Sequence, residues 1–304
     1  MIDEAQLVAG VELGGTKSIA VLARGRTIVD EARWPTGAPD ATLAAISDWL
    51  VTATRDKPIA ALGLASFGPL GLNPDQPNFG QIVNTPKPMW SGVNIRHYFA
   101  SRFPVSVGFD TDVAGAALAE GRWGASHGCH VHMYLTVGTG VGAGVVVDGK
   151  AVHGRVHPEV GHVRIRRSPD DPFVGHCAFH GDCLEGLVSG PAIAARVGKP
   201  GDQIAPNDPV WDRVANELAE LMCHLVLTLS PQRIVIGGGV MQNRPLLLPS
   251  ILARTSGLLS GYVAGLDKRE LEGLIVVPAL GASAGPLGAV ALALGALALN
   301  GSVP

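Results

Sequence analysis

The sequence predicts an α/β protein made of two halves that follow a similar plan. Short apolar runs bounded by Gly and Thr turns indicate strands, and longer apolar-patterned runs indicate helices. The expected elements of the first half are strands at Val8–Leu13, Ser18–Ala23, Thr27–Val29 and Ile59–Ala65 and a helix at Ala41–Thr54. Those of the second half are strands at His130–Val137, Gly144–Val147 and Arg233–Ile236 and a helix at Trp211–Leu229. Each half therefore opens with a hairpin and carries a helix farther along the chain.

The composition is that of a globular protein with a large core. Of the 304 residues 47% are hydrophobic and 16% are charged, which suits one large or two medium domains. The formal net charge of −3 and the lack of any long Lys/Arg block indicate no nucleic-acid partner. The acidic start of the chain has neither the positive charge nor the apolar core of a signal peptide, so we expect a cytoplasmic protein.

The end of the chain is uncharged from Gly273 to Pro304, which is long enough to cross a bilayer. Much of this stretch is Gly, Ala, Ser and Pro rather than Leu and Ile. We therefore expect a strand at Leu274–Pro278 and a buried helix at Ser283–Leu299, with no membrane partner.

A first glycine-rich motif lies between the first two strands, in the segment Gly10–Lys17. Glycines let backbone N–H groups approach an anion, and a hydroxyl and a cation add to phosphate binding. The candidate nucleotide contacts here are Gly14, Gly15, Thr16 and Lys17. The spacing differs from a Walker P-loop, and a strand follows the motif. A plain hairpin turn is the alternative interpretation.

A second such turn lies in Leu135–Gly144, and a third glycine cluster follows in Ile236–Val240. The candidate contacts are Thr136, Gly138, Thr139 and Gly140 in the second turn and Gly238 and Gly239 in the third cluster. Two glycine turns can hold a polyphosphate from both sides of a cleft, while the third cluster lets the backbone approach a base or ribose. The alternative for the third cluster is an ordinary strand-to-helix turn.

Two carboxylates lie at the junction of an apolar strand and a helix rich in small residues, in Val107–Ala117. A carboxylate at such a junction can accept the proton of a sugar hydroxyl that attacks a γ-phosphate. We assign this role to Asp112, and capping or supporting roles to Asp110 or Thr111. Asp is also a common helix N-cap, which is the alternative.

The most specific signal is a set of Cys and His residues. His162, Cys177, His180 and Cys183 have the residue types and spacing of a tetrahedral zinc site. Four protein ligands predict a closed structural site, with His157 and His176 as rival ligands and Cys129 and Cys223 left as core residues. The alternative is a group of unrelated cysteines and histidines.

Several polar residues on Gly- and Pro-rich loops are candidates for sugar binding, because carboxylates and other acceptors take hydrogen bonds from hydroxyl pairs. They are Ser66, Gly68, Asn84, Thr85, Glu159 and Glu185. Thr111, beside the candidate base, is a further candidate substrate contact. Taken singly, Glu159 and Glu185 would more often be solvated acids.

Taken in order, these motifs resemble the ROK family of sugar kinases and repressors over nearly the whole chain. The family's phosphate loop resembles Glu12–Lys17, its Asn-Asp-Ala-Asn stretch falls on Thr111–Ala114, and its Gly-Thr-Gly-x-Gly loop falls on Gly138–Gly142. Its Glu-x-Gly-His and cysteine-rich signature falls on Glu159, His162, Cys177, His180 and Cys183, with Glu185 two residues later. Its closing Ala-Gly-x-x-Gly-Ala pattern resembles Ala284–Ala289.

The resemblance implies a two-domain hexokinase/actin-like ATPase fold with duplicated βββαβα domains and a cleft between them. The small domain would hold residues 1–112 and the C-terminal helix 286–304, and the large domain residues 113–285 with the zinc loop. It further implies Asp112 as base, sugar contacts from Glu159, His162 and Glu185, ATP with Mg²⁺, structural Zn²⁺ and a homodimer.

Some details resemble the bacterial fructokinase branch, which makes fructose 6-phosphate. Glu12 stands where most members have Asp, His180 replaces a cysteine, and the loop at 84–87 reads Asn-Thr-Pro-Lys. One departure is Ala114, at the place of a usual asparagine. Alternatives are a kinase for mannose, glucose or N-acetylmannosamine, an impaired sugar-binding relative, or a nucleotide switch of the actin type. A DNA-binding repressor would need a helix-turn-helix ahead of the strand at Val8.

Overall fold

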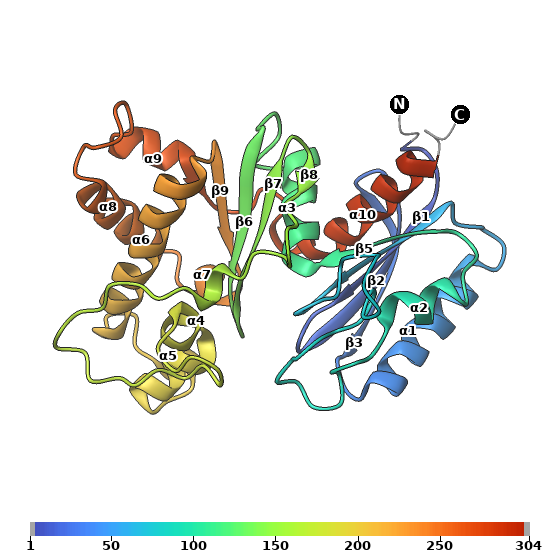
Figure 1. Cartoon of the computed structure of the whole chain (residues 1–304), viewed down its shortest axis with the longest axis horizontal. Helices are drawn as coiled ribbons and strands as arrows, with labels where there is room; N and C mark the ends of the chain where they lie inside the picture. Colours follow the sequence, from blue (N-terminus) through green and yellow to red (C-terminus); the bar gives the residue numbers. More distant parts are fainter. Residues whose placement is uncertain (1–3, 301–304) are drawn as a thin grey trace. The chain divides into compact units, whose positions relative to one another are not determined.

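The computed structural model describes residues 4–300, which form two compact units. The first holds residues 4–128, 149–158 and 280–300, and the second holds residues 129–148 and 159–279. Each unit has a mixed sheet with helices, so the predicted two-domain α/β fold is confirmed (Figure 1). The first unit continues beyond Asp112, because the helix that this residue begins packs against the C-terminal helix of the same unit.

The first unit is a five-stranded sheet covered by helices on both faces. Its strands are β1 (Val8–Leu13), β2 (Lys17–Arg24), β3 (Thr27–Pro35), β4 (Ala61–Ser66) and β5 (Ser106–Thr111), in the order β3-β2-β1-β4-β5. Its helices are α1 (Pro39–Thr54), α2 (Ile95–Ala100), α3 (Asp112–Trp123) and α10 (Ala284–Asn300), preceded by the short 3-10 turn η3 (Gly281–Ser283). The pairs β1–β2 and β2–β3 are antiparallel, and β1–β4 and β4–β5 are parallel. The two-residue strand β8 (Lys150–Ala151) lies in the return segment.

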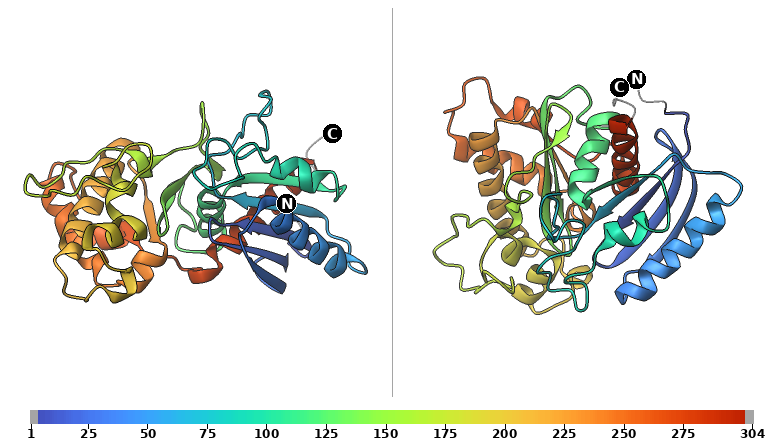
Figure 2. Two further views of the ribbon diagram at one scale, coloured as in Figure 1. Left: turned by 90° about the horizontal axis from the view of Figure 1, so that it is seen from below. Right: turned by 45° about the vertical axis from the view of Figure 1, so that its right-hand side comes forward.

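Alternation along β1 decides which side chains meet which helices. Ala9, Val11 and Leu13 are buried in the cluster that contains the apolar faces of α1 and α2. Val8 faces the opposite side, where it packs with Val290 of α10. Helices α1 and α10 lie on opposite faces of the blue strands in the right-hand view of Figure 2. Glu12, in phase with Val8, therefore lies on the α10 face.

Helix α10 lies unusually close to this sheet because glycines line the strands beneath it. A Cβ on Gly63 of β4 would overlap the carbonyl oxygen of Ala289, and one on Gly108 of β5 would overlap that of Leu292. A Cβ on Gly10 would lie 3.0 Å from the Cβ of Ala289. Helix backbone thus packs on strand backbone, and only glycine leaves the required room.

The second unit has its own sheet with a layer of helices. Its strands are β6 (Val131–Val137), β7 (Val141–Val147), β9 (Arg233–Gly237) and β10 (Ile275–Val276), with β6 between β7 and β9 and β10 next to β9. Its helical elements are η1 (Val160–His162), α4 (Leu184–Val188), α5 (Gly190–Val197), η2 (Gly201–Gln203), α6 (Val210–Leu229), α7 (Gly239–Asn243), α8 (Leu247–Leu259) and α9 (Lys268–Leu274). The core of the unit joins apolar residues of β6, β7 and β9 to those of α4, α6 and α8.

The helical segment Gly281–Leu299, formed by η3 and most of α10, is long and apolar enough to cross a membrane by length and composition. In the structure α10 packs against β1, β4, β5 and α3 within the first unit. The prediction of a buried helix after a strand near Ile275 is confirmed, although the strand covers two residues only. The chief differences in length are at β3, which extends to Pro35, and β7, which begins at Val141.

The packing of α10 generates a stability prediction with a matched control. We expect Gly63→Ala to lower the free energy of unfolding by about 1–3 kcal/mol or more, since the added methyl must displace helix backbone. Gly257 is an exposed position in α8 with open space around its Cα, so Gly257→Ala should instead stabilise by about 1 kcal/mol. Urea unfolding of both variants measures the two changes. Equal effects would contradict the close approach of α10.

Candidate active site and metal cluster

The first glycine-rich loop is the turn between β1 and β2. The Gly14 N–H donates to the Lys17 carbonyl at 3.0 Å, which closes the turn. The N–H groups of Gly15 and Thr16 have no hydrogen-bond partner within residues 4–300, and both residues are exposed. Exposed N–H groups beside Lys17 have the chemistry of an anion site.

Lys87 supports this loop in a way that the sequence did not predict. Its Nζ donates to the carbonyl oxygen of Gly15 at 2.8 Å and to that of Thr36 at 3.0 Å. The segment that carries Lys87 is itself folded locally: the Thr85 N–H donates to Ser91 Oγ at 3.2 Å, and Thr85 Oγ1 accepts from the Lys87 N–H at 3.3 Å. The lysine thus ties the 84–91 loop to the first glycine-rich turn.

The ends of the parallel strands meet at one edge of the first sheet. Leu13, Ser66 and Thr111 are in register across β1, β4 and β5. In open α/β sheets ligands bind beyond the carboxyl ends of such strands. Ser66 is fully buried, and its hydroxyl donates to the Phe67 carbonyl at 2.9 Å. Asn84 is exposed with a positive φ of 45°.

Asp112 is the first residue of α3 and directly follows β5. Thr111 is the N-cap, because its Oγ1 accepts from the Ala114 N–H at 3.1 Å. The Asp112 carboxylate accepts from the Val113 N–H at 2.9 Å, and burial raises the pKa of Asp112 to about 6. A carboxyl with this pKa is ionised at neutral pH, yet basic enough to take a proton from a hydroxyl.

Glu12 is a second carboxyl of the same region that the site prediction omitted. Its Oε2 is buried without a hydrogen-bond partner in residues 4–300, and a Cβ on Gly285 of α10 would overlap its carboxylate. Burial, followed by the charge of Asp112, raises the pKa of Glu12 to about 7. The signal available in the sequence was a charged residue in phase with Val8 on an otherwise buried strand.

Two histidines of the return segment 149–158 also pack into the first unit. His153 Nε2 lies 3.0 Å from Asp110 Oδ2, and the hydrogen bond to Asp110 raises the pKa of His153. Asp110 is buried and also accepts from the Thr111 N–H at 2.7 Å. His157 Nε2 accepts from the Leu70 N–H at 3.1 Å, next to the Gly68–Pro69 peptide bond, which is cis.

The second glycine-rich loop, residues 137–141, is the turn between β6 and β7. The Gly138 N–H donates to the Gly140 carbonyl at 2.8 Å, while the N–H groups of Thr139 and Gly140 have no partner in the described part of the chain. The third glycine cluster lies against this loop. Gly238 has a φ of 90°, and a Cβ there would lie 2.7 Å from Thr136 Oγ1. A Cβ added to Gly138 would lie 3.7 Å from the Gly239 nitrogen. The structure therefore brings Thr136, Gly138, Gly238 and Gly239 together.

The four predicted metal ligands form one cluster in the second unit. The ligand atoms of His162, Cys177, His180 and Cys183 all lie within 4.8 Å of one another. His162 Nδ1 is 3.7 Å from Cys177 Sγ and 3.5 Å from Cys183 Sγ, and His180 Nδ1 is 3.7 Å from Cys177 Sγ. Metal–sulfur and metal–nitrogen bonds of about 2.3 and 2.05 Å at tetrahedral angles give S···N edges of about 3.6 Å. The donors thus fit a tetrahedral metal.

The rival ligands lie elsewhere. His157 belongs to the first unit, where it accepts the hydrogen bond from Leu70, and His176 is exposed and outside the cluster. Cys129 and Cys223 are half-buried free thiols, and Cys223 packs against the core of the second unit.

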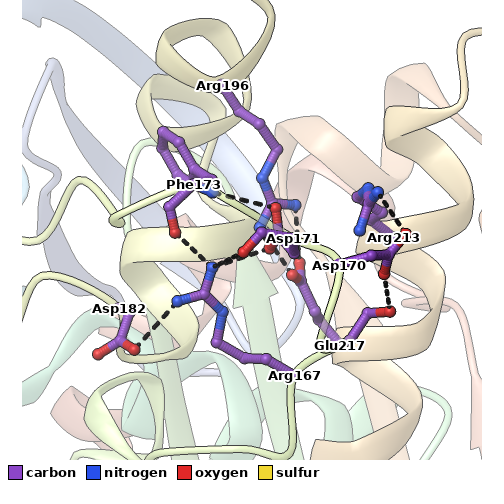
Figure 3. Close-up of polar contacts among 9 residues, drawn as sticks. Arg167, Asp170, Asp171, Phe173, Asp182, Arg196, Arg213 and Glu217 are labelled. Atoms are coloured by element: carbon purple, nitrogen blue, oxygen red, sulfur yellow. Dashed lines mark hydrogen bonds and ion pairs between the residues drawn. The ribbon is translucent and has the colours of Figure 1, made fainter.

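A network of arginines and carboxylates anchors the loop that carries the cluster (Figure 3). Asp182, next to Cys183, accepts from Arg167 at 3.1 Å, and Arg167 also pairs with Asp171 at 2.9 Å. Arg196 of α5 joins Asp171 at 3.0 Å to Glu217 of α6 at 2.7 Å. The Arg196, Asp171 and Glu217 side chains are at most 7% exposed, so the pairs are shielded from water.

Comparison with known proteins identifies the chain's relatives. The model of the ROK family matches residues 8–296. A fructokinase of Zymomonas mobilis is 41% identical over 97% of this chain and 99% of its own, and one of Pediococcus pentosaceus is 37% identical over 96% and 99%. The ROK hexokinase of Thermus thermophilus has a TM-score of 0.78 at 27% identity, covering 97% of this chain and all of that one.

A ROK family glucokinase of Streptomyces griseus, solved with glucose and AMPPNP, has a TM-score of 0.72 at 24% identity and covers 94% of this chain and 99% of its own. This likeness supports the fold. The family model and the full-length relatives confirm the resemblance that the motifs predicted: the chain belongs to the ROK family.

Proposed function

We propose that this chain is an ATP-dependent hexose kinase that converts D-fructose to fructose 6-phosphate. The observation that carries the proposal is the carboxylate of Asp112, placed at the first turn of α3 with a pKa raised by burial to about 6. The sugar choice rests on the fructokinases that match the whole chain at 37–41% identity. Kinases for related sugars are also similar, among them a kanosamine kinase of Amycolatopsis mediterranei at 30% identity.

In the proposed reaction Asp112 takes the proton of the sugar hydroxyl as its oxygen forms a bond to the γ-phosphorus of ATP. The bond from this phosphorus to the β–γ bridging oxygen breaks, and ADP leaves with that oxygen. The free N–H groups of Gly15 and Thr16 and the cation of Lys17 suit phosphate oxygens. The same applies to the N–H groups of Thr139 and Gly140.

Magnesium, when bound with ATP, neutralises charge that builds up on the phosphates. The buried and unpartnered Oε2 of Glu12 fits a contact with such a cation or with its water, and Asp112 supplies the neighbouring carboxylate. Gly14, Gly15, Thr16, Lys17, Thr136, Gly138, Thr139, Gly140, Gly238 and Gly239 remain the proposed nucleotide contacts.

The proposed sugar contacts are Ser66, Gly68, Asn84, Thr85, Thr111, Glu159, His162 and Glu185. His162 presents Nδ1 to the metal cluster, so its Nε2 is the nitrogen left for a sugar hydroxyl. The Thr111 hydroxyl caps α3 and retains its proton for donation. Ala114 is buried and has no polar side-chain atom, and its backbone N–H donates a hydrogen bond to Thr111 Oγ1.

We further propose that the metal is zinc with a structural role, since all four tetrahedral positions are filled by protein ligands. Four free thiols suit a reducing compartment, which supports a cytoplasmic location. The homodimer is an expectation from the family alone.

The first test is ADP release from Mg-ATP with fructose, mannose, glucose, N-acetylmannosamine or no sugar. We expect the highest kcat/KM with fructose and little turnover without sugar. Stimulation by another sugar would keep the reaction and replace the substrate. A protein whose ATP turnover ignores every sugar would not be this kinase, and a binding role would follow.

Asp112→Asn should lower kcat by roughly 10²–10⁴-fold while the Kd for fructose changes little, because the amide cannot accept the proton. In the wild type, kcat/KM should fall about tenfold per pH unit below pH 6, since the raised pKa of about 6 leaves Asp112 protonated there. The control Asp48→Asn changes an exposed carboxylate of α1 and should leave kcat within about twofold. Retained turnover in Asp112→Asn would remove this residue as the base.

Metal analysis should find one zinc per chain, and chelation should lower Tm, because the loop from His162 to Cys183 depends on the ion. Cys177→Ser should lose the zinc, whereas Cys223→Ser, at a half-buried thiol of α6 outside the cluster, should keep it. Unchanged melting of a zinc-free preparation would contradict the structural role.

A further inference from the structure

The carboxylate of Glu185 lies on the second glycine-rich loop. Its Oε2 accepts from the Val141 N–H at 3.0 Å, and a Cβ on Gly140 would fall 2.8 Å from the same oxygen. Glu185 is half-buried, and its Oε1 has no hydrogen-bond partner within residues 4–300. A hydrogen bond from a backbone N–H to a carboxylate is stronger than one between neutral groups. The side chain therefore holds the end of this loop.

Two further contacts fix the same loop from neighbouring segments. Gly161 in η1 packs against it so closely that a Cβ there would overlap the Val141 carbonyl oxygen. The Gly190 N–H, at the start of α5, donates to the Gly138 carbonyl at 2.7 Å. Val141 is thus held on its N–H by Glu185 and packed on its carbonyl by Gly161.

Both contact points on Val141 adjoin metal ligands. Gly161 precedes His162, and Glu185 follows Cys183 by two residues in α4. The two ligands are 3.5 Å apart at His162 Nδ1 and Cys183 Sγ. An ion bound there would fix the spacing of the two segments, and with it the position of Val141.

We propose that Glu185 is a positioning residue for the second glycine-rich loop and links the metal cluster to it. The inference rests on the proposed function, in which the Thr139 and Gly140 N–H groups bind nucleotide phosphate. Glu185 would act through the backbone of Val141 and not on the phosphate, which a carboxylate repels. Its Oε1 remains for the proposed sugar contact, so the same carboxylate would bind a sugar hydroxyl through Oε1 and hold the loop through Oε2.

The test measures ADP affinity without sugar, by calorimetry on zinc-loaded protein. We expect Glu185→Ala to weaken ADP binding by about tenfold, as a lost hydrogen bond to a charged group would. Glu185→Gln, whose amide oxygen can still accept from Val141, should stay within about threefold. Wild-type protein from which a chelator has removed the zinc should lose about as much ADP affinity as Glu185→Ala.

The matched control is Glu159→Ala, the other acidic sugar contact, whose carbonyl oxygen accepts from the His162 N–H. It should raise the KM for fructose and leave the Kd for ADP unchanged. If Glu185→Ala behaves in the same way as Glu159→Ala, Glu185 is a sugar contact only and the proposal is overturned.

Hydrogen exchange of a peptide spanning residues 137–141 separates this inference from the proposed function. Loss of the Glu185 contact should speed exchange at the Val141 amide whether or not the protein phosphorylates a sugar. Equal protection in wild type and Glu185→Ala would overturn the inference even in an active kinase. Where Glu185→Ala loses zinc, Glu185→Asp supplies the same comparison, because its shorter side chain cannot reach Val141.

Discussion

The close approach of α10 to the strands of the first unit is the constraint on which its candidate site depends. Gly63 and Gly108 let helix backbone lie directly on strand backbone, and Gly115 of α3 meets Gly288 of α10 in the same manner. Helix α3 begins directly after β5, and Gly285 in the first turn of α10 lies against the Glu12 carboxylate near the end of β1, so both helices start close to the carboxyl ends of the strands. The packing of α10 and α3 on the sheet thereby places Glu12 and Asp112 in one partly desolvated region.

In the second unit the constraint is different, because the loop that carries the Cys and His cluster, residues 162–183, buries little apolar surface. Val174 and Phe179 of this loop are largely exposed, and only a few of its side chains, among them Ile165 and Phe173, pack against the core. Side-chain contacts add to this packing. The four candidate ligands bring the start and the end of the loop together, and the buried pairs of Arg196 with Asp171 and Glu217 tie its middle to α5 and α6. Removing one member of such a shielded network leaves an uncompensated charge, which costs more than the pair contributes.

The sequence predicts most elements and the four Cys and His residues that cluster in the structure, because apolar periodicity and ligand spacing are local signals. The predicted strand ends at Val29, short of Pro35, because β3 lies at the sheet edge with no buried residue and so lacks the alternation that marks a half-buried strand. The roles of Lys87, His153 and Glu185 toward the loops and Asp110 depend on partners 43–72 residues away in the chain. No spacing rule reports contacts of this kind.

The two carboxyls of the first unit also set how its stability depends on pH. A folded-state pKa of about 7 for Glu12 and about 6 for Asp112 lies above the usual values of 4.5 and 3.8. The folded protein therefore binds more protons than the unfolded chain in this window, and the free energy of unfolding falls as pH rises through it. At neutral pH the unliganded site holds carboxylate charge that burial disfavours. A cationic ligand would offset this cost and the repulsion between the Glu12 and Asp112 carboxylates. The same desolvation that lowers the stability of the free protein therefore favours binding of a positively charged group.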